Sequence, residues 1–348
     1  MVDIVMVANM GFYSKSNKMG LGGELLWTPV IKSYSEATRA PALLVKIPSI
    51  SDLIMGRLYC SYDSFESSVI FKNNPYVTHP KIERVGFLRK LIDKIFLKII
   101  SLLKLKKIYE RWIFAKAKDT NRLYLDLTIL SYAAKEFKDH FEWKKGGHII
   151  DIFSREIGVE KKYHELFLYF SDDEKQKVKV LLKKENLSDQ KFIVIEPHTN
   201  TDYFGNLRAW PFERWQTVIN KLKQKYPDYK IVQVGTGNLR HLENIDVSFV
   251  GKTTFRETCL IIQNGKLFCG TEGGLMHAAY AVKKRSVIVW SGVTEPSFAG
   301  YPNFSTIIHH EVFCSPCGRR YKCPYNHECI EKIETKLVYH AIETELEK

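Results

Sequence analysis

The second half of the chain repeats one unit, in which a short apolar run leads into a glycine-containing loop and then into a helix-like segment. Two of the runs end directly at a glycine, at Gly235 and at Gly270. Strands that alternate with helices predict a parallel sheet with helical crossovers, and such sheets bind ligands outside the carboxyl ends of their strands. The predicted strands cover residues 192–195, 229–234, 266–269 and 286–290, and the clearest helices cover 215–225 and 275–281.

The first half of the chain follows the same rhythm. Predicted strands cover residues 3–8, 42–47 and 122–127, a further candidate strand covers 68–71, and a helix is expected at about 150–157. A length of 348 residues suits two domains of ordinary size. We therefore expect an α/β protein with one Rossmann-like domain over residues 1–180 and a second over residues 190–348.

A basic segment at residues 86–118 interrupts this rhythm. Residues 81–119 carry 12 Lys or Arg and 4 Asp or Glu, so most of the chain's net charge of +13 lies in one segment, which argues against a nucleic-acid partner. Apolar side chains recur at three- and four-residue steps between the lysines, which predicts an amphipathic helix inserted in the N-terminal domain. Such a helix either lies on an anionic membrane surface or packs on its own domain with a solvated lysine face. The apolar positions are Leu88, Leu91, Ile92, Ile95, Ile99, Leu102 and Leu103.

The apolar runs also bear on location. None reaches about 18 residues, and the first one lacks a basic leader. We therefore expect a cytoplasmic protein, which the basic helix would place at the inner face of the inner membrane if it binds lipid.

The turn after the third predicted strand of the second half carries the strongest chemical signal. Glu272, Gly273 and Gly274 lead from a strand into a helix, and adjacent glycines leave the backbone bare. Free N–H groups and the helix dipole at such a place favour a phosphate group. The alternative is an ordinary tight turn whose glycines serve packing. Three residues after Gly274, in the helix that the turn opens, His277 either contacts the phosphate or packs as a structural histidine.

Two other strand ends contribute candidate ligand contacts. Arg208 stands just before Trp210 and Pro211, where a helix begins, and its guanidinium group matches the geometry of a diphosphate. The alternative is a surface arginine. His198 follows the first strand of this half, and Gly235 and Thr236 follow the second strand, where we expect the nucleoside.

In this order and spacing, the segment around Arg208 and the turn at residues 272–277 resemble glycosyltransferase family 9, the heptosyltransferases of lipopolysaccharide synthesis. The resemblance is clearest over residues 190–300, extends to residues 20–35 and is absent from the basic insert. It implies a GT-B architecture, with two Rossmann-like domains facing a central cleft. It also implies an inverting transfer of heptose from ADP-heptose, bound by the C-terminal domain, to a lipopolysaccharide core or related glycan, bound by the N-terminal domain. No catalytic metal is expected.

The family's motifs map onto this chain with two changes. The family places a Lys or Arg that contacts the donor before its Trp-Pro pair, and Arg208 holds that place. Its Asp-Thr-Gly-x-x-His turn corresponds to residues 272–277, with Glu272 for Asp and Gly273 for Thr. The later Phe-Gly-x-Thr-x-Pro motif resembles residues 291–296.

The resemblance also proposes a general base. The family usually has Gly-Asp-x-Leu near its N-terminus, with the Asp as the base, and here Gly22, Gly23, Glu24 and Leu25 stand there. The carboxylate is therefore displaced by one residue, to Glu24, which becomes the candidate that takes the proton of the acceptor hydroxyl. Gly22 and Gly23 are expected to line the acceptor. The alternative for Glu24 is a helix-start carboxylate stabilised by the dipole. Second candidates for the base are Asp126 and His198.

Four of the seven cysteines gather near the C-terminus. Cys314, Cys317, Cys323 and Cys329 fall within 16 residues, a spacing that fits a tetrahedral structural site for Zn or Fe. The alternatives are reduced thiols and loop disulfides. The other three, Cys60, Cys259 and Cys269, lie in apolar contexts and are expected to be buried.

Other functions remain open at the level of sequence. A protein O-heptosyltransferase and a nucleotide-sugar epimerase or hydrolase would use the same fold. A binding module for nucleic acid or membrane would use the basic insert and the cysteine loop. The Glu-Gly-Gly turn together with Arg208 before Trp-Pro favours the transferase.

Overall fold

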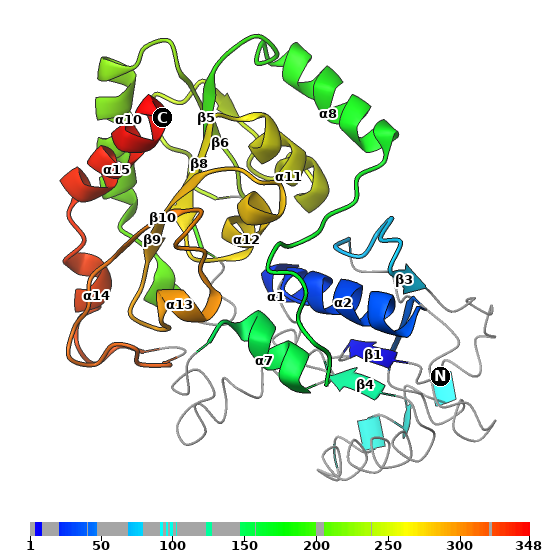
Figure 1. Ribbon diagram of the computed structural model, residues 1–348. Helices are drawn as coiled ribbons and strands as arrows, with labels where there is room; N and C mark the ends of the chain where they lie inside the picture. Colours follow the sequence, from blue (N-terminus) through cyan, green and yellow to red (C-terminus); the bar gives the residue numbers. More distant parts are fainter. Residues whose placement is uncertain are drawn as a thin grey trace. The chain divides into compact units, whose positions relative to one another are not determined.

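The computed structural model of the protein divides into two compact units, which are described separately (Figure 1). The first contains Met1–Glu136 and Ile150–His164, and the second contains Phe137–Ile149 and Glu165–Lys348. The structure describes residues 4–8, 21–39, 41–46, 69–78, 91–92, 95–96, 98–99, 102, 123–126, 147–156, 158–199, 205–237, 239–319 and 322–348. Within these ranges, none of the helices has the length and hydropathy that a membrane span requires.

The first unit is built on a four-stranded parallel sheet in the order β3-β2-β1-β4. Its strands are β1 (Ile4–Ala8), β2 (Ala42–Lys46), β3 (Val77–Thr78) and β4 (Leu123–Asp126). Its helices are α1 (Leu21–Leu25), α2 (Thr28–Thr38) and α7 (Ile149–Glu156). Trp27, between α1 and α2, stacks on Phe153 of α7 with ring centroids 3.9 Å apart. The predicted strands at 3–8, 42–47 and 122–127 and the helix at 150–157 are confirmed.

The predicted strand at residues 68–71 is wrong where the structure describes it, because residues 69–73 form a turn. Asn73 adopts a left-handed conformation with φ of 60°, and the Asn74 side chain accepts a hydrogen bond from the Tyr76 backbone at 2.9 Å. Asparagine favours both features. The apolar side chains of Ile70 and Phe71 are buried from this turn rather than from a strand.

The second unit has a six-stranded parallel sheet in the order β10-β9-β8-β5-β6-β7. Numbered from β5 in chain order, the strands have the order 3-2-1-4-5-6 of dinucleotide-binding folds. The side on which successive strands are added changes between β5 and β8. The strands are β5 (Phe192–Glu196), β6 (Lys230–Gln233), β7 (Val247–Ser248), β8 (Leu267–Thr271), β9 (Ser286–Trp290) and β10 (Thr306–His309). The helices are α8 (Asp172–Lys184), α10 (Phe212–Lys225), α11 (Phe255–Asn264), α12 (Gly274–Ala281), α13 (Pro296–Ala299), α14 (Glu328–Glu331) and α15 (Thr335–Glu347), with a 3-10 turn η2 at Gly205–Arg208.

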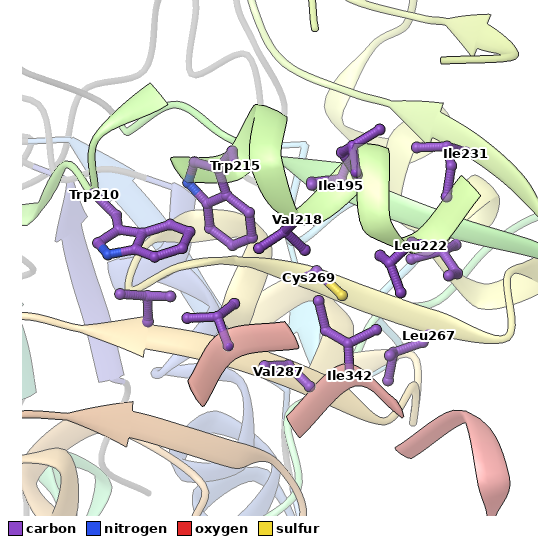
Figure 2. Close-up of a cluster of buried hydrophobic side chains, with 14 of the residues drawn as sticks. Ile195, Trp210, Trp215, Val218, Leu222, Ile231, Leu267, Cys269, Val287 and Ile342 are labelled. Carbon is purple, nitrogen blue, oxygen red and sulfur yellow. The ribbon is translucent and has the colours of Figure 1, made fainter. Parts of the chain in front are cut away.

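The core of this unit lies where α10 and α15 meet the sheet (Figure 2). Trp215 and Leu222 of α10 and Ile342 of α15 join one buried cluster with strand residues such as Ile195 and Cys269. Alternate strand residues, among them Val194, Phe268 and Ile288, are also fully buried, so the sheet is covered on both faces. Cys259 and Cys269 are buried as expected, and Cys60 lies outside the described residues.

Helix α8 belongs to the second unit, although the expected domain boundary lay near residues 180–190. Its N-terminus is a capping box in which Ser171 and Glu174 exchange hydrogen bonds with each other's backbone. The Glu174 carboxylate also pairs with Arg256 of α11, whose Nε lies 2.8 Å away and whose side chain is almost fully buried. This pair ties the segment that begins at Glu165 to the C-terminal sheet.

Candidate functional site

In the second sheet the strands after β5 are added on one side and those from β8 onward on the other. This switch point, between β5 and β8, brings the segment after β5 close to the turn at residues 272–274. Glu196, at the end of β5, is the register partner of Gly270 in β8. Glu272 follows β8, and α12 begins at Gly274 with no side-chain cap on its first turn. The first backbone N–H groups of an uncapped helix lack intrahelical partners and attract an anion. The fold therefore places an uncapped helix N-terminus, a candidate anion-binding turn, at the position where such sheets hold nucleotides.

The side chain of Glu272 is held by the protein. It is 2% exposed and accepts hydrogen bonds from the Ser291 backbone at 3.1 Å, from the Ser291 hydroxyl and from the Thr294 hydroxyl at 3.3 Å. Its Oε2 also lies 3.4 Å from Nε of Arg208. The carboxylate thus fastens the turn to residues 291–294 and to Arg208, and a ligand would meet the backbone of residues 272–274.

The charges of this pair stabilise each other against burial. Burial raises the pKa of Glu272, whereas Arg208 and the hydrogen bonds from Ser291 and Thr294 act to lower it. Burial also lowers the pKa of Arg208, and the charge of Glu272 opposes that shift. A buried charge that loses its partner is strongly destabilising, so the two side chains depend on each other.

Arg208 is presented by a rigid support. It ends η2, and the Trp-Pro pair that follows is anchored because the Trp210 indole N–H donates to the Ile333 carbonyl at 3.1 Å. The Trp210 ring also packs edge-on against Trp215, with centroids 4.9 Å apart. The Arg208 side chain is 20% exposed, which leaves part of it open to a ligand.

His277 lies in the first half of α12 and is 8% exposed. Its Nδ1 is 2.6 Å from the hydroxyl of Tyr301. Burial, together with the charges of His148 and Arg208, lowers the pKa of His277 to about 3, so the imidazole is neutral. No sequence motif marked Tyr301, and its separation of 24 residues from His277 hides the contact.

The expected nucleoside loop follows β6. Thr236 and Gly237 are exposed, and the Gly235 carbonyl accepts from the Gly251 backbone at 2.9 Å. A Cβ at Gly251 would stand 2.8 Å from the Gly237 carbonyl oxygen, and its φ of 67° is left-handed, so glycine is required there. Gly251 is a determinant of the loop that the sequence did not reveal.

His198 has a local partner at the same end of the sheet. Its Nε2 donates to the Arg240 carbonyl at 2.8 Å, and its ring stacks on Phe212 with centroids 5.2 Å apart. The histidine therefore ties the end of β5 to the segment after β6. The bond uses one ring nitrogen and leaves Nδ1 for any further contact.

The candidate base lies in the first unit. Glu24 belongs to the first turn of α1, is partly buried, and accepts a backbone hydrogen bond from Trp27 at 3.1 Å through its carbonyl. In the same helix Gly22 is buried and Gly23 partly buried. Asp126 ends β4, beside β1, where it pairs in register with Val7. Asp126 is therefore the last residue of a strand of the first sheet, and Glu24 belongs to a helix of the same unit.

Cys314, Cys317 and Cys323 lie in the loop before α14, Cys329 lies in α14, and all four are unpaired; residues 314–329 are called the cysteine loop. Burial raises the pKa of Cys329 and of Cys317, and the other thiols of the loop act in the same direction, which shows that they are neighbours. Three of the sulfurs accept hydrogen bonds from backbone N–H groups. Cys329 accepts from Gly292, Cys317 accepts from Arg319, and Cys323 accepts from Tyr325 at 3.4 Å. Such bonds stabilise thiolates, so the donor set fits a sulfur-bound ion. Within the described ranges, no three such side chains are already drawn together around an ion position.

Glu196 has an environment that predicts a pH dependence. Desolvation raises the pKa of its carboxyl from 4.5 to about 8. Between pH 4.5 and about pH 8, this carboxyl is ionised in the unfolded chain and protonated in the folded chain. The stability that the protonated carboxyl allows is therefore complete below about pH 4.5 and is lost as the pH rises toward 8. Glu196→Gln should therefore melt at a higher temperature than the wild type at pH 7.5, with the difference shrinking toward pH 4.5. A melting difference that is constant across this range contradicts the assignment.

Comparison with known proteins places the fold. Among solved structures, the glycosyl transferase family 9 protein of Veillonella parvula DSM 2008 is 16% identical with a TM-score of 0.61, over 99% of this chain and 98% of that one. The E. coli ADP-heptose lps heptosyltransferase II is 12% identical with a TM-score of 0.58, over 99% and 98%. The iron-containing dodecameric glycosyltransferase TibC of enterotoxigenic E. coli H10407 is 14% identical with a TM-score of 0.61, over 100% of this chain and 77% of that one. These proteins are GT-B glycosyltransferases, and this chain shares their fold, as expected.

Sequence comparison gives the family. No curated protein sequence matches the chain. The profile of glycosyltransferase family 9 (heptosyltransferase) matches residues 148–327, which is more than half of the 348 residues and includes Arg208, the 272–277 turn and most of the cysteine loop. The chain therefore belongs to glycosyltransferase family 9, the heptosyltransferase family, and is a glycosyltransferase.

Proposed function

We propose that the protein transfers heptose from ADP-heptose to a lipopolysaccharide core or a related cell-surface glycan. The observation that carries the proposal is the coupling of Arg208 to the turn at residues 272–274, where an uncapped helix and a guanidinium group meet at the nucleotide position of the sheet. The structural likeness to an ADP-heptose lipopolysaccharide heptosyltransferase supports this choice of donor and acceptor.

The proposed reaction is a single inverting displacement. The acceptor oxygen forms a bond to the anomeric carbon while the bond from that carbon to the diphosphate oxygen breaks. The acceptor proton passes to the Glu24 carboxylate, and the nucleoside diphosphate leaves with its electron pair. Arg208 and the backbone N–H groups of Gly273 and Gly274 stabilise the negative charge that grows on this leaving group, since the Glu272 N–H already donates to the Val289 carbonyl. Gly235 and Thr236 lie against the nucleoside.

A panel of nucleotide sugars tests this proposal. ADP-heptose at about 100 times its Kd should stabilise the fold by about 2.7 kcal/mol, which thermal shift detects. UDP- and GDP-sugars should shift the melting temperature less, and heptose should appear on a lipopolysaccharide-core oligosaccharide. Stabilisation by UDP- or GDP-sugars alone contradicts the donor. Release of free sugar or an epimer without acceptor favours a hydrolase or an epimerase, and modification of a protein alone favours a protein O-heptosyltransferase.

The basic insert is proposed to bind the surface of an anionic membrane. The described residues of this segment are helical, and apolar side chains along it face solvent rather than a protein core. Lys98, one of the described helical residues, is exposed as well, and further lysines lie at positions 90, 94 and 104 of the sequence. An apolar stripe with flanking lysines suits the headgroup region of an anionic bilayer, where a lipid-linked acceptor would be found. The exposed fractions are 41% for Leu91, 49% for Ile92, 51% for Ile95, 47% for Ile99 and 73% for Leu102.

Vesicle co-sedimentation tests the membrane contact. The protein should bind vesicles that contain phosphatidylglycerol, bind less as salt rises, and ignore vesicles of phosphatidylcholine alone. The double variant Ile95→Glu, Leu102→Glu should lower vesicle binding by about tenfold or more, because two charges replace apolar side chains that would be buried in the bilayer. Val180→Glu is the matched control, since Val180 is 58% exposed on α8. Equal loss in the control, or unchanged binding in the double variant, counts against this surface.

A structural Fe or Zn ion at Cys314, Cys317, Cys323 and Cys329 completes the proposal. Four thiolates saturate a tetrahedral ion and leave no position for substrate, so the ion would supply a cross-link of the loop. TibC, a structural neighbour, is described as iron-containing, which supports iron as one choice.

A further inference from the structure

A buried pair of neutral side chains lies behind the anion-binding turn. The Tyr301 hydroxyl and Nδ1 of His277 are 2.6 Å apart, and the two residues are 7% and 8% exposed. Tyr301 follows α13 and is held in place because its ring stacks on Tyr280, with centroids 3.7 Å apart and planes 9° from parallel. Tyr280 in turn packs edge-on against Phe304 at 5.2 Å. The hydroxyl is therefore presented to the imidazole by a fixed ring.

Both partners are uncharged at neutral pH. Burial, with the charges of His148 and Arg208, lowers the pKa of His277 to about 3, so the ring carries a single proton. Burial and the neighbouring Tyr280 raise the pKa of Tyr301, so its hydroxyl keeps its proton. A neutral imidazole has one donor nitrogen and one acceptor nitrogen, and the hydrogen bond to the first nitrogen decides which role the second one takes.

The chemistry of the pair selects one arrangement. A phenol is a stronger acid than a neutral imidazole N–H, and an imidazole nitrogen is a stronger base than a phenol oxygen. The Tyr301 hydroxyl therefore donates to Nδ1, and the ring proton stays on Nε2. Among the described residues, Nε2 of His277 has no hydrogen-bond partner, and it is not enclosed by protein atoms.

We propose that Tyr301 is a positioning residue that holds His277 in its Nε2–H tautomer, so that the imidazole donates a hydrogen bond to the diphosphate of the nucleotide sugar. This inference rests on the proposed function of the turn. His277 lies one turn into the uncapped helix α12 and feels the charge of Arg208, so it borders the same anion site. An N–H group there binds a phosphate oxygen, whereas the lone pair of the other tautomer would repel it.

Imidazole ¹⁵N NMR of the free protein reads the tautomer directly. We expect His277 to show an unprotonated, hydrogen-bonded Nδ1 and a protonated Nε2 in the wild type. In Tyr301→Phe the ring contacts remain but the donor is gone, so the two nitrogen shifts should move toward each other as the tautomers mix. Tyr280→Phe is the matched control, because it removes a hydroxyl from the ring stacked on Tyr301 and should leave the shifts unchanged. A protonated Nδ1 in the wild type, or an unchanged spectrum in Tyr301→Phe, overturns the proposal.

Nucleotide affinity then separates positioning from simple support of the fold. Tyr301→Phe should weaken ADP binding by about tenfold. His277→Gln keeps an amide N–H near the place of Nε2 without needing Tyr301, so Tyr301→Phe in that background should change affinity by less than about twofold. Equal losses in both backgrounds, or no loss in the single variant, overturn the role of Tyr301 while the donor site stands. A wild type that binds no nucleotide removes the proposed function and the His277 contact together.

Discussion

Arg208→Ala should abolish the rise in melting temperature that an ADP-sugar produces and should lower kcat/KM at least about 100-fold. Arg208 is the cation that the fold delivers to the anion-binding turn, on a loop fixed by Trp210 and by its own contact with Glu272. In the proposed displacement the leaving diphosphate gains charge in the transition state, so a lost cation costs more there than in the ground state. Thermal shift and steady-state kinetics measure the two effects.

A second variant separates binding from stability. Alanine at position 208 leaves the Glu272 carboxylate 2% exposed without its counter-charge, so the single variant should also melt earlier. Arg208→Ala combined with Glu272→Gln removes both charges and should recover much of the melting temperature, yet still fail to respond to nucleotide. Arg240→Ala is the control, because that arginine is 62% exposed and pairs with an exposed Glu213. An Arg208→Ala protein that keeps its full nucleotide response would disprove the donor site.

The sequence predicts most of the fold because hydrophobic period and glycine position are local signals. Each predicted strand of the second half is present, whereas β7 and β10 were not predicted and the order of the six strands is known only from the folded chain. Residues 68–71 show the limit of this reading, because a short apolar run can be buried from a turn as well as from a strand. The second unit extends back to Glu165, where the Arg256–Glu174 pair joins residues 82 positions apart, and no local pattern in the sequence reveals such a contact.

The candidate site is less predictable than the fold because its side chains are positioned by contacts between residues far apart in the sequence. Motifs located Arg208 and the 272–277 turn, but the direction of the Glu272 side chain depends on Ser291 and Thr294, which lie 19 and 22 residues away. Tyr301 and Gly251 act through contacts to backbone or side-chain atoms that are distant in the sequence, and a lone tyrosine or glycine has no pattern in one sequence. Long-range partners therefore need the folded chain.

The cysteine loop contacts the segment that holds Glu272 and through it reaches the proposed donor site. The Cys317 backbone donates to the Gly292 carbonyl at 2.9 Å, and the Gly318 backbone donates to the Val293 carbonyl at 2.9 Å. A Cβ at Gly292 would stand 2.9 Å from Cβ of Cys329, so loop and segment are in direct contact. Since Ser291 and Thr294 bind Glu272, which pairs with Arg208, a loose loop should disturb nucleotide binding at a distance.

Cys329→Ser should therefore have three linked effects. The purified protein should lose the one Fe or Zn per chain that elemental analysis is expected to find in the wild type. Its melting temperature should fall, by about 2–4 °C for each kcal/mol lost in a domain of this size. Its affinity for ADP should weaken by about tenfold, because the lost cross-link loosens residues 291–294 and so the Glu272–Arg208 pair. Cys259→Ala, which alters a buried thiol outside the loop, should keep the metal and the affinity. A wild type without metal sinks the metal proposal, and a metal-free Cys329→Ser protein with unchanged ADP affinity shows that the loop does not brace the site.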